Sequence, residues 1–257
     1  SDTLESVLIT QHFKQQMLNA PRTLTSEDDQ VLVDGIATRS NAIGFFGYSF
    51  YQNNADKLAL VAVDGVQPDE TTVESGEYLL ARPLFLYTTQ EDLQAKPQLA
   101  AFVNYYLNNA NQQIREIGYF PVSDDTLQES QEQWERATGL TNDTLSSIYP
   151  VAGDLLSIGS STVSPITQRR AQGFSATPGQ NVQIQIDSIG TDAGMRAFCL
   201  ERTGDLLEAS RPMVAIDIAA CQEKLRQPLE LRIANDGIPI VVNPENTVYS
   251  VKRLMGR

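Results

Sequence analysis

The sequence predicts an α/β fold built around parallel strand pairs, and two observations support this prediction. In the second half of the chain, stretches typical of strands alternate with stretches typical of helices, and this alternation indicates a parallel α/β sheet. Glycine and hydroxyl residues stand where three of these strands end. The length of 257 residues suits one large domain or two lobes.

In the second half, most predicted strands are followed by a loop and a helix. The strand "LLSI" leads through "GSST" to the helix "SPITQRRAQGF", whose Arg169 and Arg170 we interpret as solvated surface residues. "VQIQID" alternates as a strand does, and "MRAFCLERTG" predicts the next helix. After "DLLEASRPM", the pattern predicts a helix in "DIAACQEKLRQ" and two strands around an Asp-Gly turn in "LELRIANDGIPIVVNPEN".

The first half predicts helices and strands in less regular order. Residues 4–18 and "TSEDDQVLVDGIA" have helical spacing, whereas "NAIGFFGYSFY" and "KLALVAVDG" predict strands. "EYLLARPLFLYT" is an extended run broken by Arg82-Pro83, and "LAAFVNYYLNNANQQIREIGYF" predicts an amphipathic helix capped by Gly118. Residues 122–142 are polar and acidic with helical character, and Trp134 is expected to pack that helix.

Composition excludes some classes of partner. Apolar residues make up 41% of the chain, charged residues 20%, and the net charge is −13. Nucleic acid and anionic membranes attract clustered Lys and Arg, so we expect neither as a partner. No apolar stretch approaches the roughly 20 residues of a membrane span, and the opening "SDTLESV" shows no signal-peptide pattern.

The cysteines and the histidine limit metal and acid–base chemistry. Cys199 and Cys221 are the only cysteines, and their number fits one disulfide or two buried free thiols. His12 is the only histidine and no Cys-x-x-Cys is present, so we expect no metal site and no cofactor. A Ser-His-Asp triad would depend on His12, which we interpret as a surface or core residue.

Three loops share a pattern suited to a small oxyanion. At residues 159–162, 190–194 and 209–211 a strand ends, glycine or hydroxyl residues follow, and a helix is predicted next. Helix N-termini offer free N–H groups, and the ends of parallel strands meet at one edge of a sheet. One such loop alone is an ordinary capped turn, whereas three together predict an anion site. The spacing matches neither a P-loop nor a Rossmann fingerprint.

Six stretches also carry a family resemblance. They are "GSSTVSPIT", "SIGTDAGMRAFC", "GDLLEASRPM", "NDGIPIVVNPEN", "SEDDQVLVDGIATRSNAIGFFGYSFY" and "YLLARPLFLY". Together they resemble the periplasmic phosphate-binding proteins of bacterial ABC transporters, especially the cyanobacterial-type branch. The resemblance covers most of the chain.

The order of these stretches is rotated relative to the family. The family carries the equivalent of "GSSTVSP" near its mature N-terminus and that of "GYFPV" near its C-terminus, whereas here "GYFPV" comes first. "SDT" (1–3) stands where the family has a Ser-Gly-Thr phosphate loop, with Asp2 in place of the glycine. The resemblance therefore implies a circular permutant, or a frame cut from a tandem array, with a shortened second lobe.

The implied fold is a two-lobed, type II periplasmic-binding-protein-like fold. Residues 86–240 would form the first lobe, residues 1–78 and 247–257 the second, and residues 78–87 and 238–246 the hinge crossings. The lobes would close on one oxyanion, and the resemblance implies a Cys199–Cys221 disulfide. The implied ligand-binding residues are Ser160, Ser161, Thr162, Gly190, Thr191, Ser210 and Arg211 of the first lobe, and Ser1, Asp2, Thr3 and Arg257 of the second.

The implied function is that of a non-enzymatic solute-binding component of a phosphate uptake system. It would act in the periplasm or outside the cell, with inorganic phosphate and the ABC transporter membrane subunits as partners. Exposed chain ends near the cleft could also pair with a second molecule. Two alternatives stay open: a sensor or scaffold with a weakened anion site, favoured by Asp2 and the shortened second lobe, and a phosphate-ester hydrolase.

Overall fold

The computed structural model describes residues 22–26, 29–176 and 179–245. Contacts within the chain divide it into two compact units. Unit 1 comprises residues 1–65 and 239–257, and unit 2 comprises residues 66–238. The chain therefore leaves unit 1 once and returns to it once, while the lobe limits implied by the resemblance stay a prediction.

Unit 1 contains a three-stranded antiparallel sheet. A strand from near the end of the chain, β8, lies between two strands from its first quarter, β1 and β2. An apolar core that includes Val33, Phe46 and Val241 joins the sheet to helices α2 and α3. The elements are α2 (Asp29–Ala37), β1 (Ile43–Phe45), α3 (Tyr48–Asn53), β2 (Ala59–Val61) and β8 (Ile240–Val242).

The predicted aromatic strand "NAIGFFGYSFY" is only partly a strand. β1 ends at Phe45, Gly47 is the N-cap of α3, and the following aromatic residues are helical. The ladder with β8 covers only residues 43–45, and the chain continues as a helix from Tyr48.

Unit 2 contains a five-stranded mixed sheet with the order β5-β4-β6-β3-β7. β4 runs parallel to both β5 and β6, as the strand–helix alternation predicts. β3 lies antiparallel to β6 on one side and to β7 on the other. The strands are β3 (Ala81–Thr89), β4 (Ala152–Gly159), β5 (Asn181–Asp187), β6 (Leu206–Ala209) and β7 (Pro228–Gly237).

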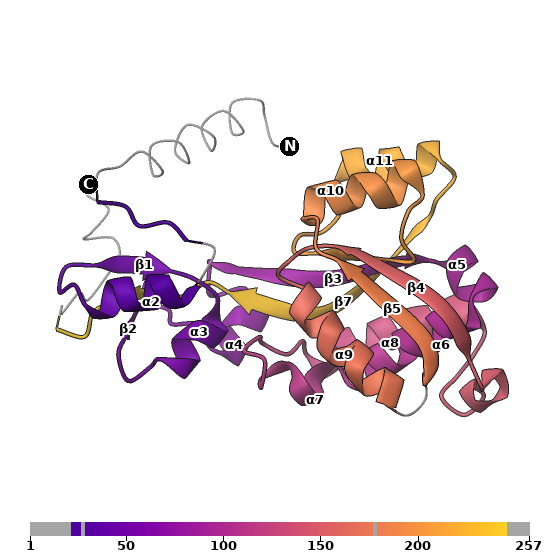
Figure 1. Ribbon diagram of the computed structural model, residues 1–257, viewed down its shortest axis with the longest axis horizontal. Helices are drawn as coiled ribbons and strands as arrows, with labels where there is room; N and C mark the ends of the chain where they lie inside the picture. Colours follow the sequence, from indigo (N-terminus) through magenta and orange to yellow (C-terminus); the bar gives the residue numbers. More distant parts are fainter. Residues whose placement is uncertain (1–21, 27–28, 177–178, 246–257) are drawn as a thin grey trace. The chain divides into compact units, whose positions relative to one another are not determined.

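Helices cover both faces of this sheet (Figure 1). Successive side chains of a strand point to opposite faces, and β3 shows this clearly. Leu84 and Leu86 join the core under α6, α8 and α9, whereas Phe85 and Tyr87 join the core under α10 and α11. The helices of unit 2 are α4 (Glu70–Glu74), α5 (Gln90–Ala95), α6 (Pro97–Asn108), α7 (Ala110–Ile114), α8 (Asp124–Thr138), η1 (Leu145–Ile148), α9 (Ser164–Ala176), α10 (Thr191–Arg196), η2 (Ala197–Glu201) and α11 (Ala215–Glu223).

The polar segment after residue 122 forms α8, as predicted. Ser123 caps its N-terminus by accepting from the N–H of Thr126, and Gly139 ends it in the left-handed conformation. Trp134 packs the helix against α6, because its side chain is buried and its indole N–H donates to the Ala100 carbonyl at 3.0 Å. The interpretation of Trp134 as a packing residue is confirmed.

The interpretation of Arg170 as a solvated residue is wrong. Arg170 on α9 is only 1% exposed. Its guanidinium donates to the carbonyl of Ala110 at 2.8 Å and to Gln113 Oε1 at 3.1 Å, and it lies over the Tyr106 ring. These acceptors belong to α7, so a pattern along α9 alone gives no sign of them. Arg169, in contrast, is exposed as predicted.

The two strands predicted around the Asp-Gly turn do not pair with each other. β7 pairs with β3 in unit 2, whereas β8 pairs with β1 and β2 in unit 1. The residues of the expected turn extend β7 instead, since Asp236 lies opposite Arg82 and Gly237 opposite Ala81.

Candidate anion site

The three loops predicted to bind an anion lie together at one edge of the unit 2 sheet. They follow β5, β4 and β6, which are parallel neighbours, so their carboxyl ends point the same way. The Ser160 N–H donates to the Glu208 carbonyl at 2.9 Å, and the Gly190 N–H donates to the Gly159 carbonyl at 2.7 Å. These bonds join all three loops. The structure thus brings together the predicted residues Ser160, Ser161, Thr162, Gly190, Thr191 and Ser210.

Gly159 allows the backbone at the end of β4 to lie close to the Glu208 carbonyl of β6. Its φ of +132° is one that other residues rarely adopt, and a Cβ at this position would lie 2.1 Å from the Glu208 carbonyl oxygen. Glycine is therefore required at residue 159, where the last residue of β4 lies against the backbone of β6.

The loops present hydrogen-bond donors. Thr191 Oγ1 accepts from the Ser210 N–H and lies 3.1 Å from Ser210 Oγ, so one of the two hydroxyl hydrogens stays available. Within the part of the chain that the structure describes, the N–H groups of Ser161 and Thr191 have no protein acceptor. Ser161 is exposed and Thr191 and Ser210 are half-buried, so a small ligand can reach the loops.

Thr162 is held by two residues that the sequence analysis did not select. Arg82 Nη2 on β3 donates to Thr162 Oγ1 at 3.0 Å, and the Tyr119 hydroxyl donates to the Thr162 carbonyl at 2.7 Å. Arg82 also donates to Asp236 Oδ2 from Nε at 3.0 Å and from Nη2 at 2.9 Å. Asp236 is only 4% exposed; its burial raises the pKa of the carboxyl, and the charge of Arg82 opposes that shift. Only "ARP" and "NDG", far apart in the sequence, could have suggested this pair.

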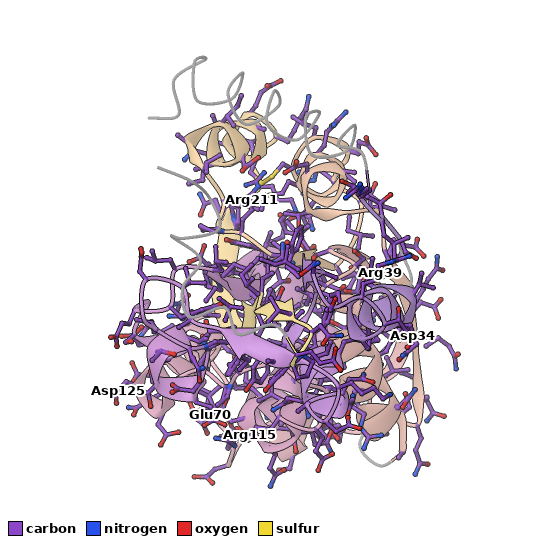
Figure 2. The ribbon with its side chains drawn as sticks, turned by 90° about the vertical axis from the view of Figure 1, so that its left-hand side faces the viewer. Asp34, Arg39, Glu70, Arg115, Asp125 and Arg211 are labelled. Atoms are coloured by element: carbon purple, nitrogen blue, oxygen red, sulfur yellow. A yellow bond between two sulfur atoms is a disulfide. The ribbon has the colours of Figure 1, made fainter. Side chains whose placement is uncertain are left out.

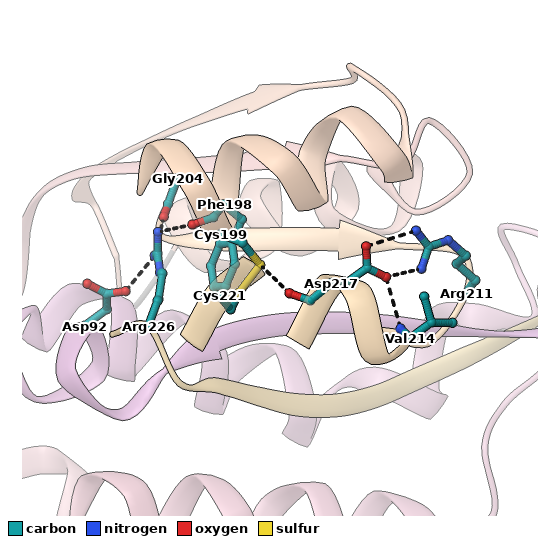
Figure 3. The surroundings of a disulfide bond; sticks show 9 residues. All are labelled: Asp92, Phe198, Cys199, Gly204, Arg211, Val214, Asp217, Cys221 and Arg226. Carbon is teal, nitrogen blue, oxygen red and sulfur yellow. Dashed lines mark hydrogen bonds and ion pairs between the residues drawn. A yellow bond between two sulfur atoms is a disulfide. The ribbon is translucent and has the colours of Figure 1, made fainter. Parts of the chain in front are cut away.

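Arg211 lies next to Ser210, but its guanidinium already has acceptors (Figure 3). It bonds to Asp192 at 2.7 Å, to Asp217 at 2.6 Å and to the Pro212 carbonyl at 3.0 Å. Burial opposes ionisation of Asp217, yet the hydrogen bonds from Arg211 and from the Val214 N–H hold its pKa below the usual value. Arg211 therefore ties the β6 loop to α10 and α11.

A buried carboxyl lies beneath the loops. The side chain of Glu208 on β6 is fully buried and accepts hydrogen bonds from Ser157 Oγ at 2.7 Å and Ser164 Oγ at 2.6 Å. Ser188 Oγ in turn donates to Ser164 Oγ. Burial raises the pKa of Glu208 although these hydroxyls partly oppose the shift. A single glutamate in the apolar run "DLLEA" was the only sequence signal of this group.

We expect Glu208→Gln to change the pH dependence of stability. Because the folded state raises the pKa of Glu208, it binds this proton more tightly than the unfolded chain does. The associated stabilisation is present at low pH and is lost as pH rises from the usual glutamate value through the raised one. Glu208→Gln removes this loss, so its free energy of unfolding relative to the wild type should increase with pH.

Urea unfolding at several pH values measures this difference. Glu129→Gln, at an exposed position of α8, is the control and should follow the wild type at every pH. A difference between Glu208→Gln and the wild type that stays constant with pH would contradict the expectation.

The disulfide implied by the resemblance is present. Cys199 and Cys221 are bonded, and they join η2 to α11 beside the Arg211–Asp217 pair (Figure 3). The other predicted ligand residues, Ser1, Asp2, Thr3 and Arg257, lie outside the described residues, as does His12.

Neither a cluster of metal ligands nor a membrane-spanning helix occurs among the described residues. Across residues 22–26, 29–176 and 179–245, no three His, Cys, Asp or Glu side chains are grouped as metal ligands. Within the same ranges, no helix combines the length and the apolar character that crossing a bilayer requires.

Comparison with known proteins shows which known fold this architecture resembles. Residues 137–255 match the model of a PBP superfamily domain. A solved phosphate-binding protein of a phosphate ABC transporter from Streptococcus pneumoniae TIGR4 superposes with a TM-score of 0.71 at 21% identity, covering 92% of this chain and 80% of that one. The chain therefore has a PBP-like fold. The predicted fold class is confirmed, whereas the circular permutation and the shortened second lobe stay predictions.

Two curated relatives match part of this chain at higher sequence identity than the solved structure does. Protein SphX from Synechocystis sp. is 38% identical over 108 residues, which are 40% of this chain and 32% of the relative. Phosphate-binding protein PstS from Staphylococcus haemolyticus is 30% identical over 107 residues, which are 40% of this chain and 34% of the relative. The chain thus spans about a third of the length of these curated relatives.

Proposed function

We propose that this chain binds inorganic phosphate, or a similar tetrahedral oxyanion, as the solute-binding component of an ABC-type uptake system. The observation that carries the proposal is the convergence of three donor-bearing loops at the carboxyl edge of β5, β4 and β6. The name of the relative PstS supports phosphate as the ligand.

Hydroxyl and N–H groups suit this role because an oxyanion offers only acceptor atoms until it is protonated. The proposed donors are Ser160, Ser161, Thr162, Thr191 and Ser210, whereas the Gly190 N–H already donates to the Gly159 carbonyl and holds the loop in place. The net charge of −13 does not oppose binding, since nearby dipoles rather than the total charge hold a small desolvated ion. In this proposal Arg211 braces the Ser210 loop beside the ligand through Asp192 and Asp217.

The remaining parts of the proposal concern the whole protein. Ser1, Asp2, Thr3 and Arg257 would complete the ligand shell from the second lobe, and closure would present the loaded protein to ABC membrane subunits in the periplasm or outside the cell. The bound ion is carried rather than transformed, so the role is binding and not catalysis.

We expect Thr162→Ala and Thr191→Ala each to weaken phosphate binding by about 1–3 kcal/mol, the cost of losing a hydrogen bond to a charged, desolvated partner. Isothermal titration calorimetry with inorganic phosphate measures the change. Thr71→Ala, at an exposed position of α4, is the control and should bind as the wild type does.

Three outcomes would contradict the proposal. Undetectable binding at millimolar phosphate would favour a sensor or scaffold role instead. Unchanged affinity in both threonine variants would mean that the ligand binds elsewhere. Turnover of a generic phosphate ester by the wild type would replace binding with hydrolysis.

A further inference from the structure

We propose that Arg82 is a cationic ligand of this anion site and raises its preference for a doubly charged oxyanion. This inference rests on the proposed function and goes beyond it, because Arg82 lies outside the three loops. The geometry of β3, the free N–H groups of Arg82 and the polarity of the Thr162 hydroxyl support it.

The sheet topology places Arg82 at the loop edge. β3 is antiparallel to β6, with Phe85 opposite Ala209, the last residue of β6. The residues of β3 that precede Phe85 therefore extend past the end of β6, alongside the segment that begins at Ser210. From there the Arg82 side chain reaches the loop after β4, where Nη2 lies 3.0 Å from Thr162 Oγ1.

Some N–H groups of the Arg82 guanidinium have no acceptor among the described residues. An arginine has five N–H groups. Nε and one N–H of Nη2 bond to Asp236, and the other N–H of Nη2 bonds to Thr162. Both N–H groups of Nη1 have no acceptor among the described residues, and the side chain is 40% exposed. Arg211 differs, because Asp192, Asp217 and Pro212 already engage its Nε, Nη1 and Nη2 atoms.

The same hydrogen bond sets the direction of the Thr162 hydroxyl. Thr162 Oγ1 accepts from Arg82, so its own hydrogen must be donated elsewhere. The free Nη1 donors and this hydroxyl thus lie on adjacent groups, and one oxyanion can accept from both. The buried carboxylate of Asp236 fixes the guanidinium plane in advance, which reduces the entropy lost when a ligand binds.

The test compares phosphate affinity in variants of Arg82 at two pH values. Arg82→Gln alone would leave Asp236 buried without its partner, so the main variant is Arg82→Gln with Asp236→Asn, and Asp236→Asn alone is measured beside it. Arg82→Lys keeps the positive charge but loses the planar, paired N–H groups of the guanidinium. Arg115→Gln is the matched control, because Arg115 at the end of α7 pairs with Glu70 and lies well away from Arg211 (Figure 2).

Calorimetric titration with inorganic phosphate is carried out at about pH 6 and about pH 8, since a phosphate group changes between one and two charges in this range. At the higher pH we expect the double variant to bind about tenfold to a hundredfold more weakly than the wild type. The loss should be smaller at the lower pH, where the ion carries less charge. Arg82→Lys should lose less than the double variant, and Arg115→Gln should match the wild type. Asp192, Asp217 and Arg211 are unchanged in the wild type and in every variant. Their effect on phosphate affinity therefore cancels when the affinity of a variant is divided by that of the wild type.

The outcomes separate this inference from the proposed function. A wild type that does not bind phosphate would remove both. A wild type that binds, together with a double variant of equal affinity, would overturn the role of Arg82 and leave the proposed function intact. An equal loss at both pH values would also overturn it, because Arg82 would then only position Thr162. If the double variant unfolds, Arg82→Lys decides, because lysine keeps the charge but lacks the paired N–H groups. A loss of affinity larger than that of Thr162→Ala supports the guanidinium as a ligand, and a loss no larger than that, which lost positioning of Thr162 alone explains, overturns it.

Discussion

Gly159→Ala is expected to lower the free energy of unfolding by about 3 kcal/mol and to weaken phosphate binding as well. The new Cβ would lie 2.1 Å from the Glu208 carbonyl oxygen, and both atoms are fixed by backbone that no rotamer change can move. The φ of +132° adds strain for any residue that carries a Cβ. Relief requires β4 and β6 to separate where the Ser160 N–H donates to Glu208, which displaces the anion loop. Urea unfolding and phosphate titration measure the two effects.

Gly76→Ala is the matched control for Gly159→Ala. Gly76 has a φ of +76°, but nothing lies within 4 Å of the position that an added Cβ would take, so this change adds strain without a collision. We expect it to cost about 1 kcal/mol and to leave phosphate affinity unchanged. Equal effects of the two substitutions would show that conformational strain, and not the approach of β4 to β6, makes glycine necessary at residue 159.

Loss of the disulfide is expected to have a comparable effect on stability. Cys199 and Cys221 are 22 residues apart in the sequence, and a crosslink that closes a loop of this size stabilises a protein by about 3 kcal/mol. Both residues are buried in the core that also contains Phe198 and Tyr87, so alanine is the suitable replacement. The double variant Cys199→Ala, Cys221→Ala should therefore unfold at a clearly lower urea concentration than the oxidised wild type.

Reductant supplies the control for this experiment. Reduction should move the wild type toward the double variant and leave the double variant unchanged. A wild type that unfolds at the same urea concentration with and without reductant, under conditions that open the bond, would contradict the assigned contribution.

Strand and loop positions in the second half of the chain could be predicted because they depend on local patterns. "VQIQID" alternates as β5 does, and "GSST" follows an apolar run as the loop after β4 does. Apolar periodicity, in contrast, does not specify a pairing partner. For this reason the two strands expected around the Asp-Gly turn, at residues 236 and 237, lie in different sheets.

The candidate site was predictable only in part, for a related reason. Ser160, Thr191 and Ser210 lie at the ends of parallel strands, and that position follows from the strand–helix alternation. Arg82 belongs to an antiparallel strand whose neighbours no local pattern reveals. Its approach to Thr162 depends on β3 lying beside β6.

The sequence by itself therefore determined the class of the fold, the three loops and the chemistry of their donors, since composition and periodicity act over a few residues. Only the tertiary structure decided which residues surround those loops. It placed Arg82 on Thr162, engaged Arg211 with two acids and buried Glu208 beneath the loops. The physical reason is that charge pairing and burial depend on contacts between residues far apart in the chain, such as Arg82 and Asp236, which only the packing of the sheet brings together.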